Sequence, residues 1–213
     1  MIQCIIFTIV AGFLSISLVQ AEIKKPDIRW STETKLGLFQ PDLPDWSEYY
    51  GSQYSVMGSQ VIAYKVFPFL EIGIDGSYIY SKGQGDLPLN NTRGGEVTLE
   101  YFPLSANLTL RGRVFKHQWL VPYFGMSIGQ LIYLQEITGQ ASVQGYVNQN
   151  YVRIGLQFLL NHFDRKATRN LYDGFGVQNT FFTAEYMLMA ATEPGSNTDL
   201  SGQALLFGIS LEY

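Results

Sequence analysis

The chain has 213 residues and a mass of 24.0 kDa, with 46% hydrophobic, 15% aromatic and 15% charged side chains. Its formal net charge is −4, from 14 basic and 18 acidic residues, which disfavours a nucleic-acid-binding protein because such a protein carries a basic face. Low charge and high aromatic content also disfavour disorder. With one cysteine and two histidines, no intrachain disulfide can form, and we expect neither a metal site nor a cofactor.

The first residues of the chain differ from the rest because residues 1–21 contain no charged side chain. The run from Ile5 to Val19 is largely apolar and ends in the small-residue pattern Val19-Gln20-Ala21. This pattern predicts a signal peptide at 1–21, cleaved after Ala21, and a single domain at 22–213. An uncleaved anchor is the alternative, although a spanning helix needs about 20 apolar residues. The mature chain would contain no cysteine, which suits an oxidising compartment.

The rest of the chain alternates apolar and polar side chains with a period of two, which is typical of β-strands. Near the C-terminus, Leu205 and Phe207 point to one side, and Ser210 and Glu212 point to the other. Pro103, inside a long strand, predicts a bulge or bend. The alternation predicts eight strands, at about 30–40, 54–66, 69–81, 93–114, 121–137, 145–160, 178–192 and 200–213.

The connections between the predicted strands alternate between short and long. Short turns are expected at 67–68 and 115–120, and longer connections at 41–53, 82–92, 138–144 and 193–199. Outer-membrane barrels have this asymmetry, with short periplasmic turns and longer external loops. The connection Asn161–Gly176 is an exception, since its apolar residues recur at a spacing of four and predict a short amphipathic helix. This helix could plug the barrel, lie on the membrane surface, or contact a periplasmic partner.

The apolar strand faces could point inward, as in a soluble barrel, or outward to lipid. Aromatic residues favour lipid, because most of them lie near predicted strand ends, where interfacial girdles occur. We therefore expect an all-β fold, an eight-stranded antiparallel up-and-down transmembrane β-barrel with one short periplasmic helix. The expected girdle residues are Trp30, Tyr54, Tyr64, Phe67, Phe69, Tyr80, Tyr101, Trp119, Tyr123, Tyr133, Tyr146 and Tyr186.

The polar strand faces would then line a lumen narrow enough for side chains to fill. Charged groups in such a lumen must pair, because an isolated buried charge is costly. We therefore expect a plugged, ion-pair-rich interior. The expected lumen charge network has six acids and four bases, namely Glu33, Lys35, Glu71, Asp75, Glu100, Arg111, Arg113, Arg153, Glu185 and Glu212.

Several segments resemble known outer-membrane barrels. The C-terminus is similar to the signal that the barrel-insertion machinery reads, with Phe207, Ile209, Leu211 and Tyr213 at alternate positions. The stretch Pro122-Tyr123-Phe124-Gly125-x-x-Ile128-Gly129 resembles the PYxGxGxG strand of small OmpA/OmpW-type barrels. A myxobacterial-type family of small outer-membrane barrels has a KLGxYxP opening, which Lys35-Leu36-Gly37-Leu38-Phe39-Gln40-Pro41 resembles. The segment from Asp164 to Tyr186 resembles that family's helix-and-strand segment. The resemblance implies a barrel in the outer membrane of a Gram-negative bacterium and brings no catalytic residue with it.

These features favour a non-enzymatic outer-membrane protein with a structural or surface-interaction role. Its expected partners are outer-membrane lipids, lipopolysaccharide and the barrel-insertion machinery, with no nucleic acid, and a monomer is favoured. The acidic and aromatic stretch at 41–53 could bind a cation or a partner, although a solvated loop is the favoured interpretation.

Three alternatives stay open at this point. The first is a narrow channel or transporter for small or hydrophobic solutes, lined by Arg111, Arg113 and Arg153. The second is a lipid A-modifying barrel enzyme, which needs a base close to a hydroxyl near the outer leaflet. It is disfavoured because His117 and His162 both map to the periplasmic side. The third is a soluble periplasmic or secreted β protein.

Overall fold

The computed structural model describes residues 28–43, 46–84, 86–87, 92–93, 95–115, 118–139, 141–192 and 199–213. The predicted signal peptide at 1–21 and His117 lie outside these residues. No helix within the described ranges is long and apolar enough to cross a membrane.

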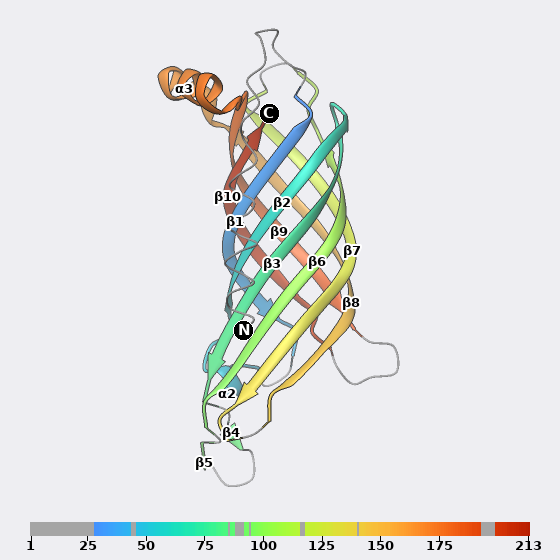
Figure 1. Cartoon of the computed structure of the whole chain (residues 1–213), viewed down its shortest axis with the longest axis vertical. Helices are drawn as coiled ribbons and strands as arrows, with labels where there is room; N and C mark the ends of the chain where they lie inside the picture. Colours follow the sequence, from blue (N-terminus) through green and yellow to red (C-terminus); the bar gives the residue numbers. More distant parts are fainter. Residues whose placement is uncertain are drawn as a thin grey trace.

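Eight antiparallel strands close into a barrel, as Figure 1 shows. Each strand pairs with the preceding and following barrel strands, and β1 closes the barrel by pairing with β10. The predicted antiparallel barrel is thereby confirmed, and each predicted strand lies within a few residues of its observed position. The strands are β1 (Trp30–Pro41), β2 (Ser55–Phe67), β3 (Leu70–Gly83), β6 (Val97–Arg111), β7 (Leu120–Ile137), β8 (Val143–Leu159), β9 (Asn179–Ala191) and β10 (Gly202–Glu212).

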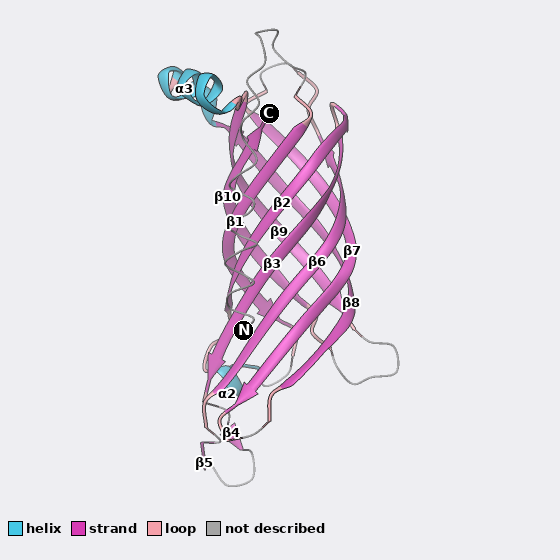
Figure 2. Cartoon of the chain, in the orientation of Figure 1, coloured by secondary structure: helices cyan, strands magenta, loops and turns pink. Residues whose placement is uncertain are grey.

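The remaining elements lie at the two ends of the barrel. Two short strands, β4 (Asp86–Leu87) and β5 (Thr92–Arg93), pair only with each other, and α2 (Trp46–Tyr50) follows β1. The helices η1 (Leu160–His162) and α3 (Arg165–Phe175) connect β8 to β9 and confirm the predicted amphipathic helix. Figure 2 shows α2 and the β4–β5 pair at one end, which we call the loop end. We call the other end, which carries α3 and the C-terminus, the helix end.

The alternation along each strand separates the lumen from the outer wall. In β10, Ala204 and Leu206 are buried inside the barrel, whereas Leu205 and Phe207 are exposed on its outside. Because a slip of one residue would exchange the two faces, the pairing register fixes which residues enter the lumen. The apolar faces therefore point outward, as predicted. Exposed wall residues include Leu36, Val56, Ile72, Ile74, Leu104, Leu108, Ile128, Ile132, Val152, Ile154, Leu188 and Ile209.

Of the bulge or bend predicted at Pro103, the bulge is absent. Tyr101 and Leu104, on either side of Pro103, pair with β3 in one continuous register, so no residue is inserted. Buried and exposed side chains alternate without interruption along β6. The register shift of the sheet occurs instead in β2, between Lys65 and Phe67.

Exposed aromatic residues gather near both ends of the outer wall. Toward the helix end, Trp30 meets Tyr64 edge-on with ring centroids 5.2 Å apart. Toward the loop end, the rings of Tyr78 and Phe102 lie 5.1 Å apart. Two aromatic belts separated by an aliphatic band are typical of barrels that span a bilayer.

Three tyrosines predicted for the girdles point inward instead. Tyr101 and Tyr123 are buried, and Tyr133 packs against the apolar residues of the lumen. The position of a residue along its strand sets its height in the barrel, whereas odd or even spacing sets its face. The girdle prediction used height alone and is wrong for these three residues.

Candidate functional site

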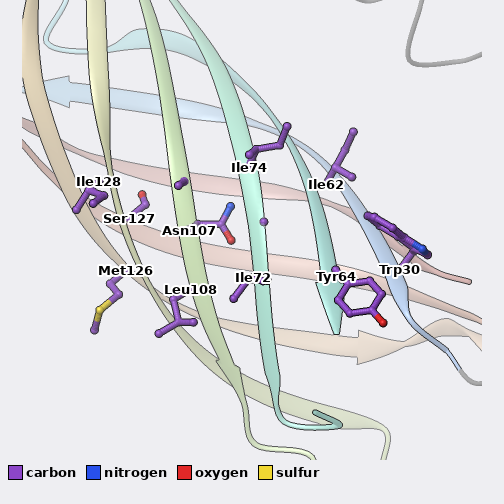
Figure 3. A pocket seen from close by; sticks show the side chains of 12 residues that line it. Trp30, Ile62, Tyr64, Ile72, Ile74, Asn107, Leu108, Met126, Ser127 and Ile128 are labelled. Atoms are coloured by element: carbon purple, nitrogen blue, oxygen red, sulfur yellow. The ribbon is translucent and has the colours of Figure 1, made fainter. Parts of the chain in front are cut away.

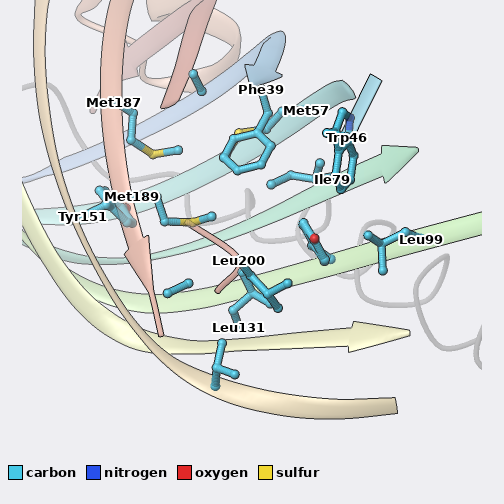
Figure 4. Packing of buried hydrophobic residues seen from close by; sticks show 14 of the residues in the cluster. Phe39, Trp46, Met57, Ile79, Leu99, Leu131, Tyr151, Met187, Met189 and Leu200 are labelled. Atoms are coloured by element: carbon cyan, nitrogen blue, oxygen red, sulfur yellow. The ribbon is translucent and has the colours of Figure 1, made fainter. Parts of the chain in front are cut away.

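The lumen is the candidate site because its side chains form layers of different chemistry. A small apolar group at the helix end consists of Val121, Leu159 and Phe181. Along β8 and β9, the charged residues Arg153 and Glu185 separate this group from a larger apolar cluster toward the loop end. That cluster, shown in Figure 4, includes Phe39, Trp46, Tyr50, Met57, Ile79, Leu99, Tyr101, Leu131, Tyr151, Met187, Met189, Leu200 and Leu206.

The lumen contains the expected ion pairs, but the apolar cluster occupies its loop-end part, which the expectation did not include. Its residues come from strand halves in which both faces are apolar, such as Met187-Leu188-Met189 in β9. Alternation of hydrophobicity does not mark a lumen face in such a segment. The loss of alternation toward the loop end is itself the signal that this part of the lumen is apolar.

Arg111 lies at the centre of the charged layer. Its Nη2 is 2.8 Å from a carboxylate oxygen of Glu33 and 2.8 Å from one of Glu71. Its Nη1 donates to Gln157 and lies 3.8 Å from Glu212. Three carboxylates thus converge on one guanidinium, whose several donors in a planar fork suit such a site better than a lysine would.

Glu185 gathers a second group of donors. Lys35 Nζ lies 2.7 Å from Glu185 Oε2, and the Tyr123 hydroxyl donates to the same oxygen over 2.7 Å. Arg153 Nη1 lies 3.7 Å from that oxygen. Lys35 Nζ is also 3.2 Å from Glu33, so it links this group to the one around the central arginine.

A third group surrounds Glu212 toward the helix end. Lys65 Nζ and Arg113 Nη2 lie 2.5 Å and 2.9 Å from its Oε1, and Asn179 donates to its Oε2 over 2.8 Å. Sequence reasoning missed Lys65, because β2 carries apolar residues on both faces. The structure alone places Lys65 inside, two residues after the buried Ala63 on the same face of β2.

Asp75 completes the charged layer on β3. The side-chain amide of Asn107 donates to its Oδ2 over 2.9 Å. Arg153 Nη2 donates to Oδ1 of the same Asn107 over 3.4 Å, so a neutral amide connects Asp75 to this cation. Every lumen residue named in the predicted network is therefore part of this layer except Glu100.

Glu100 faces the outer wall, on the same side of β6 as Phe102 and Leu104. A bulge at Pro103 would have turned it inward, and no bulge is present. The prediction of a lumen position for Glu100 is therefore wrong.

The observed lumen contains Lys65 and lacks Glu100, so its formal charge differs from that of the predicted set. The predicted set had four bases and six acids, a formal charge of −2. The described lumen carries no net formal charge. An uncompensated charge would be costly there, because the lumen is away from water. Its five acids are Glu33, Glu71, Asp75, Glu185 and Glu212, and its five bases are Lys35, Lys65, Arg111, Arg113 and Arg153.

The helix α2 covers the loop end of the apolar cluster, where the sequence predicted a solvated loop. Trp46 and Tyr50, four residues apart on one side of the helix, are buried and stacked with ring centroids 4.1 Å apart. Burial raises the pKa of Tyr50 to about 12. Gly83 on β3 permits the close approach of α2, because a Cβ at this position would lie 2.2 Å from the carbonyl oxygen of Tyr49.

The outer wall carries a shallow groove of about 730 Å³, shown in Figure 3. Trp30 and Tyr64 border one end of it, and Leu108, Met126 and Ile128 border the other. These walls are apolar, so the groove suits hydrocarbon chains rather than a polar ligand. Among the described residues, the one histidine is His162 in η1, at the helix end.

Together, the closed eight-stranded sheet, the apolar outer wall and the charged lumen define the fold of small outer-membrane barrels. The outer membrane protein OprG from Pseudomonas aeruginosa is similar, with a TM-score of 0.59 and 9% identity over 87% of this chain and 96% of that one. Neisserial surface protein A is also similar, with a TM-score of 0.51 and 10% identity over 86% of this chain and 95% of that one. At such identities the likeness shows the fold alone. No protein-family model and no curated protein matches the sequence, so the myxobacterial-type resemblance stays a prediction.

Proposed function

We propose that this protein is an integral outer-membrane β-barrel with a plugged lumen and a structural or surface-interaction role, and that it is not an enzyme. The observation that carries the proposal is the distribution of polarity between the two faces of the sheet. Charged side chains such as Arg111 and Glu212 are buried, whereas Leu36 and Ile128 are 66% and 72% exposed. A soluble barrel would have the reverse distribution, because its apolar side chains would avoid water.

The outer wall supports residence in lipid. Large apolar side chains cover it from the Trp30–Tyr64 pair to the Tyr78–Phe102 pair. A contiguous apolar surface of this size marks a membrane or protein contact. Its closed belt around a barrel, bordered by aromatic rings, fits the hydrocarbon core of a bilayer.

Three features of the lumen support a plugged barrel. An eight-stranded barrel has room inside for little more than its own side chains. Here ion pairs cross the barrel interior: Arg111 on β6 contacts Glu33 on β1, although β2 and β3 lie between these strands in the sheet. The apolar cluster and α2 then cover the loop end, with Phe39 and Leu131 each 0% exposed.

The orientation of the barrel in the membrane follows from the lengths of the connections at its two ends. The β2–β3 turn at residues 68–69 lies at the helix end, which we assign to the periplasm because outer-membrane barrels have short periplasmic turns. The loop end would then meet lipopolysaccharide and the cell exterior. Phe207 and Ile209 project from the outer wall of the terminal strand, where the insertion machinery would read them.

Four measurements, on the purified chain, on membranes and on cells, test this proposal. Folded protein should migrate differently before and after boiling on a gel and should resist carbonate extraction from membranes. In planar bilayers it should show no stable openings. Extraction into the soluble fraction would overturn the membrane assignment, and steady ion-selective openings would favour a narrow channel over a plugged barrel. An altered lipid A composition in cells expressing the protein would contradict the non-enzymatic role.

A further inference from the structure

The helix α3 presents an apolar side that the described chain leaves largely uncovered. Ala167, Leu171 and Phe175 follow one another at a spacing of four, so they share one side of the helix. None of the residues of α3 is buried, and Phe175 is 65% exposed. Phe163, just before the helix, is 85% exposed.

Hydrogen bonds at the rim of the barrel fix the position of α3. The side chain of Asn161 donates to the carbonyl oxygen of Gln178 over 2.7 Å and accepts from the amide of Thr180 over 2.8 Å. These contacts hold together the two ends of the connection that contains α3. Figure 1 shows α3 extending sideways from the rim at the helix end, away from the barrel axis.

Local signals start and stop α3 but do not explain its stability. Asp164 accepts from the amides of Lys166 and Ala167 as an N-cap, and Gly176 ends the helix with a left-handed conformation at φ 74°. A helix of 11 residues is marginal in water without packing of its apolar side. The exposed Phe175 and the half-buried Leu171 therefore favour a covering surface outside the described chain.

We propose that α3 lies on the periplasmic leaflet of the outer membrane, with its apolar side at the boundary of the acyl chains. This inference rests on the proposed function, because it needs the barrel to span a bilayer. Such a helix lies in the plane of the interface, as amphipathic interfacial helices do. The lipid-facing wall leads directly to it, since the backbone carbonyl of Trp119, whose side chain is exposed, accepts a hydrogen bond from the amide of Leu159 just before η1.

The charged side of α3 fits anionic phospholipid. Arg165, Lys166 and Arg169 are exposed, and long basic side chains can reach phosphate headgroups while their stems lie against apolar surface. Of the two acids, Asp164 is engaged in capping the helix, which leaves Asp173. A lipid surface therefore suits both sides of α3 at once.

Spin labels on opposite sides of α3 test the inference in the full chain, folded into vesicles. Phe175→Cys places a label on the apolar side, and Asp173→Cys is the matched control on the polar side, both in a Cys4→Ser background. The label at 175 should collide with oxygen and be protected from an aqueous nickel chelate, and the label at 173 should show the reverse. The contrast should be larger with phosphatidylglycerol present than with phosphatidylcholine alone. Lys166→Gln combined with Arg169→Gln should abolish that increase.

The alternatives give different results. Equal exposure of both labels to the nickel chelate would overturn the inference. So would protection at 175 that appears only in native membranes, which indicates a protein partner, or only at high protein density, which indicates a second copy. An unchanged effect of phosphatidylglycerol in the double variant would overturn the role of the charges. A boiling-dependent gel shift of the same samples separates failure of this inference from failure of barrel insertion.

Discussion

Arg111 is the residue on which most lumen carboxylates depend. Replacing it by methionine keeps much of the volume but leaves Glu33 and Glu71 without their shared donor. Removing one partner of a buried ion pair costs about 3–5 kcal/mol, because the other charge stays buried. We predict that Arg111→Met lowers the free energy of unfolding by that amount, measured by urea titration of the protein folded in vesicles.

Arg165 provides the control for this prediction. It has the same chemistry but is exposed at the start of α3 and outside the barrel. Surface substitutions usually change stability by less than about 0.5 kcal/mol. Arg165→Met should therefore leave the unfolding midpoint nearly unchanged, and equal losses in the two variants would argue against a buried ion network.

A second pair of substitutions tests which glutamates face the lumen. Glu185→Gln removes the charge that Lys35 and Tyr123 contact at 2.7 Å each, so we predict a loss of about 3–5 kcal/mol in unfolding free energy. Glu100→Gln should cause no comparable loss, because Glu100 lies on the outer face, away from the cations of the lumen. The urea midpoints of the two variants are compared. A larger loss for Glu100→Gln than for Glu185→Gln would indicate that Glu100 lies in the lumen, as the sequence predicted.

The faces of most strand residues follow from the sequence, and the exceptions have physical causes. Glu212 and Arg153 alternate with apolar neighbours, so simple alternation places them inside. Glu100 could not be placed, because its face depends on whether Pro103 inserts a residue, and only the pairing with β3 decides that. Lys65 was missed because β2 has no polar face to follow.

Among the elements, α2 depends on a close approach that one glycine permits. Gly83→Ala would place a Cβ 2.4 Å from Tyr50 Cα, so α2 must move away from the lumen. We predict faster amide hydrogen exchange across residues 46–51 in this variant. Gly174→Ala is the control, because a Cβ there meets nothing within 4 Å, and it should leave exchange in 46–51 unchanged. Unchanged exchange in Gly83→Ala would mean that α2 does not rest on β3.

The two helices show what short-range patterns can predict. In α3 the apolar spacing of four and the terminal glycine predict the helix, since both signals are local. The sequence does not predict α2, because its five residues become helical by burying Trp46 and Tyr50 in the barrel. That burial depends on tertiary contacts, which no periodicity in a short segment reveals.

At the scale of the whole molecule, closure of the sheet fixes which face of every strand lies inside the barrel. Once β1 pairs with β10, one face of every strand is inside, and a neutral set of ion pairs and an apolar cluster must share that volume. Strand number and the outward apolar face follow from the sequence, because they need only alternation and turn spacing. The layering of the lumen does not, since it depends on which residues meet across the barrel.

The direction in which the apolar side chains point is tested most directly by quenching of tryptophan fluorescence in vesicles of lipids brominated along the acyl chains. Two variants are compared, one that keeps only Trp46 and one that carries Ile128→Trp, with every other tryptophan replaced by phenylalanine. Ile128 is 72% exposed on the wall and Trp46 is 6% exposed inside. We predict strong quenching of the fluorophore at 128 and little at Trp46. Strong quenching of Trp46, or a fluorophore at 128 that only aqueous acrylamide quenches, would contradict an outward-facing apolar wall in lipid.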